Sequence, residues 1–179
     1  SRSFAILMRE GLMPSNSLSQ MIETFDVSKN SIGEEGSILL QGWFNAIGDN
    51  SRMRCINLNK TSANITLLAQ AFCSLPLLEE LNIGNNYIDP SATKLICDIA
   101  NLSSSLKLFN ASKCGLNHDF IGSFLLAITT NGRLQQTKVL LGGNSIADKY
   151  GVDVIVNNLV KSCNLHTLDL SDAKMTEEG

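Results

Sequence analysis

The chain has 179 residues, of which 44% are hydrophobic and 17% charged, and its formal net charge at pH 7 is −3. These values predict a folded domain with a sizeable core and speak against a disordered chain. The acidic balance gives no support for a nucleic-acid partner, and no apolar run approaches the ~20 residues of a transmembrane helix.

The first predicted elements are a helix over residues 4–12 and, after it, an eleven-residue motif. Residues 22–32 (IETFDVSKNSI) fit the pattern LxxLxLxxNxL, with a large apolar residue wherever the pattern has Leu. The motif recurs from residues 53, 78, 106, 136 and 165, at spacings of 31, 25, 28, 30 and 29. Such a period is the signature of the leucine-rich repeat. We therefore predict one α/β solenoid over residues 1–179, with a parallel sheet on its concave side and helices on its convex side.

A repeat of this length has room for a helix between successive strands. Apolar residues at helical spacing predict helices over residues 36–47, 91–100, 120–128 and 152–160. Asp89 and Pro90 favour a helix start, because Asp caps free amides and Pro suits the first turn. Trp43 is expected to pack against the strands. The uneven first spacings predict a local irregularity near residues 45–64.

Position 9 of the motif is the Asn of the pattern, and it varies between repeats. It holds Asn30, Thr61, Asn86, Cys114, Asn144 and Ala173. We expect the Asn side chains to bond backbone groups of their own loop and of the next one, Thr and Cys to do so in part, and Ala not at all. Position 1 of the fifth motif is the polar Gln136.

Both chain ends fall inside a repeat, and neither shows the polar capping repeat that a solenoid needs. We therefore expect a longer solenoid, of which these residues are a piece.

Five cysteines without a CxxC pair favour reduced, buried thiols in a cytoplasmic protein over a metal site. Four glycosylation sequons, which would suit a secreted protein, begin at Asn59, Asn64, Asn101 and Asn110. Asn110, however, is expected within a strand, so cytoplasm remains the preferred location.

Catalytic chemistry has little support. His118 and His166 have no partner carboxylate or serine at a motif spacing. Residues 141–144 (LGGN) lack the rest of a phosphate-binding loop, and the Glu pairs at 34–35 and 177–178 suit helix starts. We predict no catalytic, cofactor or metal site, and no enzymatic activity.

The candidate site is instead the concave face, where positions 3, 5, 7 and 8 of each motif should point. Position 5 is mostly Asn or Asp, and position 8 holds three lysines that suit an acidic protein or membrane surface. Two apolar residues, Leu108 and Leu140, adjoin them and form a small exposed apolar patch. The predicted partner-binding residues are Lys29, Lys60, Lys113, Asn57, Asn82, Asn110, Leu108 and Leu140. The alternative is a polar face that simply stays hydrated.

The long period and predicted helices resemble the ribonuclease-inhibitor-like class of leucine-rich repeats. Within that class the chain is most similar to the CARMIL family of actin regulators, through residues 54–61 (RCINLNKT), 140–144 (LLGGN) and 165–175 (LHTLDLSDAKM). The resemblance implies a cytoskeletal scaffold that regulates actin capping protein and associates with class I myosins and membranes. The capping-protein segment of that family lies in a tail beyond its repeats, so no site residue carries over.

Two other protein classes use similar repeats. One is the GTPase-activating protein for Ran, which would require an acidic tail and loop residues that do not match here. The other is the ligand-recognition repeats of an innate-immune sensor, which would require a nucleotide-binding domain before the repeats.

Overall fold

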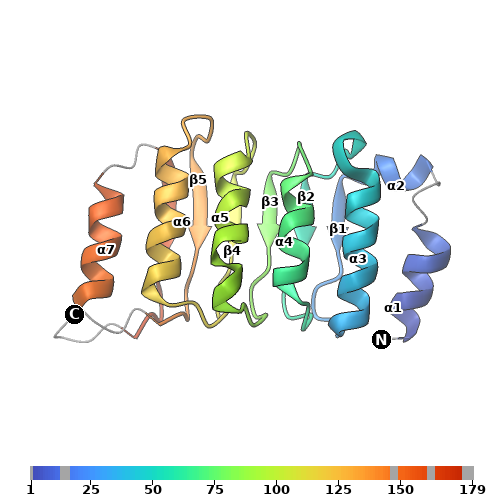
Figure 1. The fold of residues 1–179 in the computed structure, drawn as a ribbon, viewed down its shortest axis with the longest axis horizontal. Helices are drawn as coiled ribbons and strands as arrows, with labels where there is room; N and C mark the ends of the chain where they lie inside the picture. Colours follow the sequence, from blue (N-terminus) through green and yellow to red (C-terminus); the bar gives the residue numbers. More distant parts are fainter. Residues whose placement is uncertain (1, 13–16, 146–148, 161–163, 175–179) are drawn as a thin grey trace.

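The computed structural model describes residues 2–12, 17–145, 149–160 and 164–174. Six strands form one sheet in chain order, every neighbouring pair parallel (Figure 1). The strands are β1 (Thr24–Asp26), β2 (Cys55–Asn57), β3 (Glu80–Asn82), β4 (Leu108–Asn110), β5 (Thr137–Leu140) and β6 (Leu165–Asp169). The described part of the chain is therefore a leucine-rich repeat solenoid, as the motif spacing predicts.

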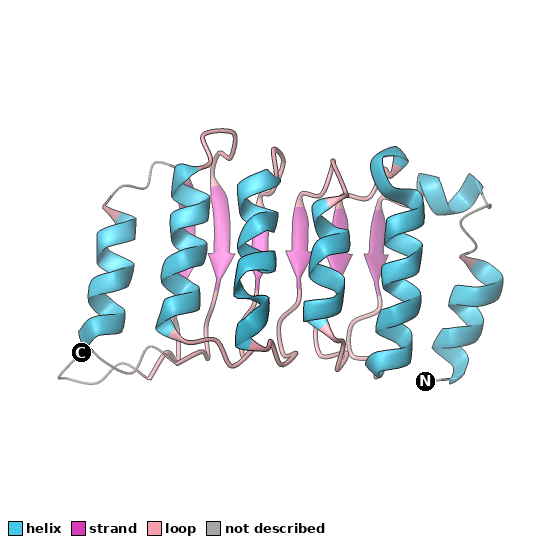
Figure 2. Ribbon diagram, viewed as in Figure 1, coloured by secondary structure: helices cyan, strands magenta, loops and turns pink. Residues whose placement is uncertain are grey.

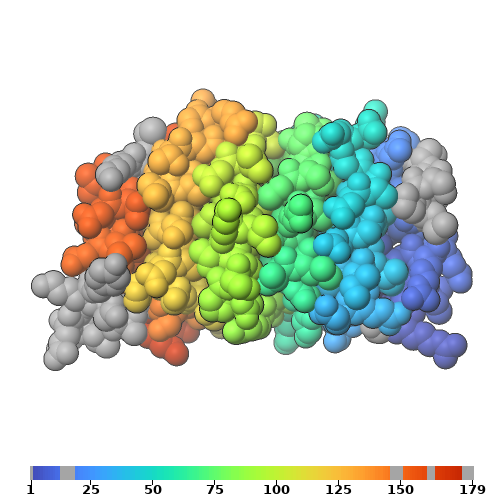
Figure 3. All heavy atoms as spheres, in the orientation of Figure 1, coloured from blue at the N-terminus to red at the C-terminus, as the bar shows by residue number. Residues whose placement is uncertain are grey.

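Helices cover one face of this sheet and leave the other open (Figure 2). The α-helices are α1 (Arg2–Ile6), α2 (Ser17–Met21), α3 (Gly33–Ile47), α4 (Ile65–Cys73), α5 (Thr93–Leu102), α6 (His118–Thr130) and α7 (Lys149–Leu159). A π-helical turn, η1 (Leu7–Gly11), and two 3₁₀ turns, η2 (Gly48–Asn50) and η3 (Pro90–Ala92), complete them. From α3 onwards each helix packs on the next, and Figure 3 shows α3 to α6 as a closed layer.

The strands are aligned by position 4 of the motif, which places Phe25 beside Ile56 and Ile56 beside Leu81. The register is unbroken across the 31- and 25-residue spacings. The long first repeat is accommodated on the helix side, by the 15-residue α3 and the turn η2. The irregularity expected near residues 45–64 therefore lies outside the sheet.

The core is a continuous apolar layer between sheet and helices. Trp43 is 3% exposed and its ring centroid lies 5.0 Å from that of Phe25, which confirms that this helix packs on the strands. Phe109 and Phe124 stack at 4.2 Å between strand and helix. Each such buried side chain contributes about 1.5–3 kcal/mol through removal of apolar surface from water.

The position-9 asparagines bond their own loop, as expected, and Asn86 and Asn144 also bond the preceding loop. The expectation that they would reach the next loop is wrong. Asn86 Oδ1 accepts from the backbone N–H groups of Thr61 and Ala63, at 3.0 and 3.2 Å. Its Nδ2 donates to Leu58 O in that same loop, at 2.8 Å. The direction follows from the parallel stacking, in which this side chain lies over the free amides of the coil before it.

Thr61 and Cys114 lack that carboxamide, and the backbone compensates. Ile32 N–H donates to Thr61 O, and Ile88 N–H donates to Cys114 O, at 2.9 and 3.1 Å. Ala63 occupies the same motif position as Ile32 and Ile88, but its N–H donates to the side chain of Asn86 instead. We call these position-9 hydrogen bonds to the preceding loop the ladder. At Thr61 and Cys114 the ladder continues, with a backbone carbonyl as the acceptor.

Several sequence predictions need correction within the described residues. Gln136 is exposed with φ 55°, and Thr137 occupies the buried first position, because the pairing of β5 with β6 shifts by one residue there. Helix α4 was not predicted at all. The short α2 was not predicted either, and the helix expected over residues 4–12 is divided between α1 and η1. Helices α3, α5, α6 and α7 lie where the spacing predicts them, and the Asp89 side chain caps Ser91 N–H as expected. Four predicted features lie outside the described residues: the last apolar positions of the fifth and sixth motifs (Ile146 and Met175), one of the five cysteines (Cys163), and the Glu pair at 177–178.

Candidate protein-binding face

The position-5 side chains first have a structural task. Each polar member accepts a hydrogen bond from the backbone N–H two residues later, at 2.8–3.2 Å, and so closes the turn after its strand. These residues are Asp26, Asn57, Asn82, Asn110 and Asp169. Turn closure alone therefore accounts for the Asn and Asp row.

Two of these side chains also bond each other, because Asn57 Nδ2 donates to Asp26 Oδ2 at 2.9 Å. No described residue accepts a hydrogen bond from the side-chain N–H₂ of Asn82 or Asn110, so these donors are available to a partner. The N–H of Ser28, helped by Asn57 and Lys29, lowers the pKa of Asp26. Asp26 therefore carries its negative charge at neutral pH.

A hollow of about 340 Å³ lies on this open face and crosses β1 to β5. It brings together five of the eight predicted site residues. These five are Asn57, Asn82, Leu108, Asn110 and Leu140. The rest of its lining is Thr24, Asp26, Cys55, Ile56 and Glu80. We call this set of residues the hollow.

The three predicted lysines are exposed but do not line the hollow. Lys29, Lys60 and Lys113 occupy the left-handed backbone region, with φ of 61°, 56° and 56°, in the turns that follow β1, β2 and β4. Their backbone N–H groups bond the next loop, for instance Lys60 N–H to Gly84 O at 2.9 Å. The lysines therefore border the open face where the strands end.

The opposite border carries a row of alternating charge that the sequence analysis missed. Arg54 lies between Glu23 and Glu79, at 3.8 and 2.5 Å, and Lys107 reaches Glu79 at 2.8 Å. Lys107 and Arg54 lower the pKa of Glu79. Position 2 alternates Glu, Arg, Glu, Lys along the first four motifs, and that alternation was the available signal.

The cysteines differ in exposure. Cys55 is half-buried in the hollow, and burial and the Glu80 carboxylate raise the pKa of its thiol. Burial raises the pKa of Cys73, Cys97 and Cys114 to about 11. Within the described ranges, no three His, Cys, Asp or Glu side chains are grouped to hold a metal ion. None of the described helices has the length and apolar character to cross a bilayer.

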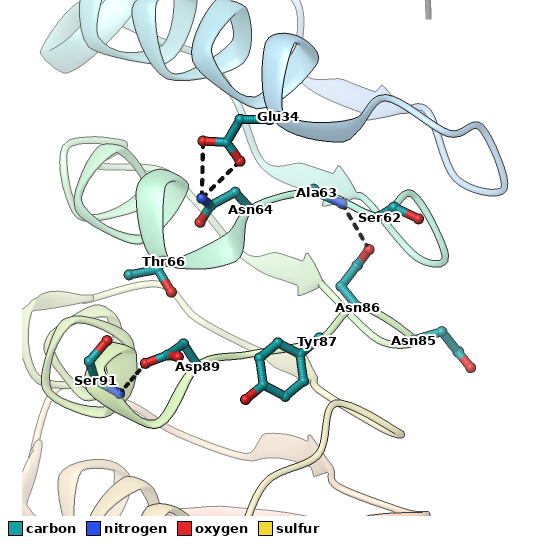
Figure 4. Close-up of a pocket in the computed structure, with 10 residues that line it drawn as sticks. All are labelled: Glu34, Ser62, Ala63, Asn64, Thr66, Asn85, Asn86, Tyr87, Asp89 and Ser91. Carbon is teal, nitrogen blue, oxygen red and sulfur yellow. Dashed lines mark hydrogen bonds between the residues drawn. The ribbon is translucent and has the colours of Figure 1, made fainter.

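A second depression of about 560 Å³ lies where the loops after β2 and β3 meet the starts of α3, α4 and η3 (Figure 4). Its polar groups largely bond one another. Glu34 accepts from Asn64 Nδ2, Asn86 accepts from Ala63 N–H, and Asp89 accepts from Ser91 N–H. Tyr87 at its border is 72% exposed. Since these contacts already hold the loops and helix starts together, the hollow is the better candidate for partner binding.

Comparison with known proteins agrees with this architecture. Over 163 residues, 89% of the chain, it is 25% identical to NACHT, LRR and PYD domains-containing protein 3 of Homo sapiens and 24% identical to that of Macaca mulatta. The chain spans only 15 to 16% of the length of these relatives. No protein-family model matches the chain.

Among solved structures, the tropomodulin C-terminal domain of Caenorhabditis elegans superimposes with a TM-score of 0.53 at 11% identity. The match covers 95% of this chain and 81% of that one. At such identity the structural likeness concerns the fold alone.

Proposed function

We propose that this chain is a non-catalytic protein-interaction scaffold whose partner docks on the open face of the sheet. The observation that carries the proposal is the hollow, where available amide donors of Asn82 and Asn110 lie beside the apolar Leu108 and Leu140. A pairing of apolar contact with directional hydrogen bonds is the usual composition of a protein interface. Repeat solenoids offer such extended faces, on which residues vary without cost to the core.

The three lysines contribute as bordering charges in this proposal. Exposed charges at the margin of an interface act mainly by steering the partner during association. Replacing Lys29, Lys60 and Lys113 together by Asn preserves the left-handed turn, because Asn85 holds the equivalent position after β3 with φ 55°. For an acidic protein partner we expect slower association and a weaker dependence on salt, measured by surface plasmon resonance. Docking on an acidic membrane surface remains a prediction of the sequence.

The cytoskeletal role is the first of two finer proposals. It is supported by the CARMIL-like residues 54–61, 140–144 and 165–175, and its expected partners are actin capping protein and class I myosins. The tropomodulin domain shares the fold and carries no further weight. The direct measurement is binding of the purified chain to purified actin capping protein, where a lack of association at micromolar concentrations counts against this role.

The second finer proposal is a part of the repeat region of an innate-immune sensor. The likeness to NACHT, LRR and PYD domains-containing protein 3 extends over 89% of the chain at the level of sequence, which favours this reading specifically. The identity of the bound partners distinguishes the two roles. The cytoskeletal role predicts that cytoskeletal proteins bind the open face, and the sensor role does not.

Site-specific photo-crosslinking in cells tests the docking face itself. A photoreactive residue at Glu80, which lines the hollow, should capture a partner, whereas one at Leu126, 44% exposed on α6, should not. Both positions are in regular elements, so the substitutions disturb the fold similarly little. Capture only from Leu126 would move the docking site to the helices and contradict the proposal.

A further inference from the structure

The open face has a polarity that changes from one strand to the next. Position 3 of the motif is Glu80 on β3, Leu108 on β4 and Lys138 on β5. The sheet register places Glu80 directly beside Leu108, and Leu108 directly beside Lys138. Acidic, apolar and basic side chains thus follow one another across three strands. We call these three residues the position-3 row.

The two charges of the row are available to a partner. Glu80 and Lys138 are both exposed, and neither forms an ion pair with another described residue. This contrasts with the position-2 border, where Arg54 and Lys107 already occupy Glu79. Leu108 is half-buried, lines the hollow and adjoins Leu140 there. An apolar contact is therefore flanked by two unpaired charges of opposite sign.

The spacing of the row matches that of an α-helix. Neighbouring strands lie about 4.8 Å apart, so the row spans about 9.6 Å. On a helix, side chains three or four residues apart lie about 5–6 Å from each other, and seven residues rise about 10.5 Å. A helix laid across the strands therefore places three side chains, one turn apart, over the three residues of the row.

From this complementarity we propose that the open face binds a helical segment of a partner protein. That segment presents a basic, an apolar and an acidic side chain at successive turns. The basic side chain pairs with Glu80, the apolar one packs on Leu108 and Leu140, and the acidic one pairs with Lys138. This inference rests on the proposed function, since it names the partner chemistry of the same face.

The probe for the test is a phage-displayed, alanine-rich helix randomised at residues i, i+4 and i+7 and selected on the full chain. We expect enrichment of helices with one basic, one central apolar and one acidic residue, in either order, because a helix can lie in either direction. Selection on Glu80→Lys should instead enrich acidic residues at both ends. Selection on Lys138→Glu should enrich basic residues at both ends.

Affinities give the second readout. A selected helix should bind each charge-reversal variant about three- to fivefold more weakly than wild type, the range expected for one exposed ion pair. Leu108→Ser should weaken it about tenfold or more, because apolar contact is lost. Glu10→Lys, a charge reversal of an exposed residue in η1, is the matched control and should leave binding unchanged.

The outcomes separate the two proposals. Helices that respond to Leu108→Ser but show no charge preference overturn the position-3 row and leave the docking face intact. Helices that ignore all three changes bind elsewhere and contradict both. If no helix is enriched, the helical partner is refuted, and the crosslinking at Glu80 decides on the face independently.

Discussion

At the scale of single residues, position 9 shows how one structural need is met in two ways. The free amides of each loop require an acceptor from the coil that follows. Asn144 supplies its side-chain carbonyl to the N–H groups of Cys114 and Leu116, at 3.0 and 3.1 Å. Where Thr61 or Cys114 stands in that position, a backbone carbonyl takes over part of this role. The motif therefore tolerates small polar residues there without a break in the sheet.

We predict that Asn86→Ala destabilises the fold far more than Asn30→Ala. Asn86 is 2% exposed and bonds backbone groups of two loops, so its removal leaves buried donors and acceptors unpaired, at a cost of about 3 kcal/mol or more. Asn30 is exposed and bonds only its own loop, so water replaces its contacts and the cost stays below about 1 kcal/mol. Urea unfolding of both variants measures the difference, and equal midpoints would contradict the ladder.

The sequence predicted which residues share the open face but not what each one does. Pattern positions fix the side on which Asn57, Asn82 and Asn110 point, because strand residues alternate. That these side chains close turns depends on the backbone after the strand, which periodicity does not encode. The sequence predicts the three lysines along one edge of the open face, and their left-handed turns place them at that border, outside the hollow.

At the scale of elements, α4 was overlooked although local signals existed. Ile65, Leu68, Ala69 and Phe72 follow helical spacing, and Asn64 precedes them as a cap. At nine residues α4 is only one residue shorter than α5, so its apolar spacing and its cap together could have predicted it.

Asn64→Ala should therefore cost about 1 kcal/mol of unfolding free energy, the usual value of a lost helix cap. Its Oδ1 accepts from Leu67 N–H at 3.0 Å, and its Nδ2 donates to Glu34. Asn64→Asp retains the cap but sets a second carboxylate against Glu34, so it should also destabilise at pH 7. Adding Glu34→Gln should restore the stability of Asn64→Asp in urea unfolding. A failure to restore would show that the contact with Glu34 is not what Asp disturbs.

Two helical glycines should respond oppositely to Ala. A Cβ on Gly42 in α3 meets nothing within 4 Å, so Gly42→Ala should stabilise by about 0.5–1 kcal/mol through lower chain entropy in the unfolded state. A Cβ on Gly122 would collide with Val154 Cγ1 at the contact between α6 and α7, so Gly122→Ala should destabilise by about 1–3 kcal/mol. Thermal unfolding measures both. Stabilisation by Gly122→Ala would mean that α7 packs more loosely on α6 than described.

At the scale of the whole molecule, the repeat period alone predicts the architecture. Each repeat packs only on its neighbours, so a wrong prediction in one repeat leaves the predictions for the other repeats unaffected. Examples are the unpredicted α4 and the first position of the fifth motif, which Thr137 occupies. Function does not follow in the same way, because it depends on the exposed residues that the repeat leaves free to vary.

Acid should weaken the fold through carboxylates distributed along the solenoid. The pKa values of Asp26, Glu79, Asp89 and Asp169 are all lowered, chiefly by hydrogen bonds from Ser28, Lys107, Ser91 and Ser171 respectively. A carboxylate whose folded pKa lies below its unfolded value stabilises the fold above the unfolded pKa, at about 4. That contribution is lost as pH falls through the lower folded pKa. We therefore expect urea midpoints to be level between pH 7 and pH 5 and to decline below about pH 4.

The variant Glu79→Gln isolates the share of the charged border in that decline. It removes a carboxylate that pairs with both Arg54 and Lys107, so its urea midpoint should lie below wild type at pH 7. The two midpoints should approach each other as pH falls towards 3, because the wild-type carboxyl takes up its proton as pH passes its lowered folded pKa. High salt should reduce the gap at pH 7, because exposed ion pairs are screened. Asp89, whose carboxylate accepts from Ser91 N–H, provides the contrast. The gap of Asp89→Asn should be small and nearly independent of salt, since Asn can accept the same hydrogen bond. A Glu79→Gln gap that persists unchanged at pH 3 would show that the border acts through packing and not through charge.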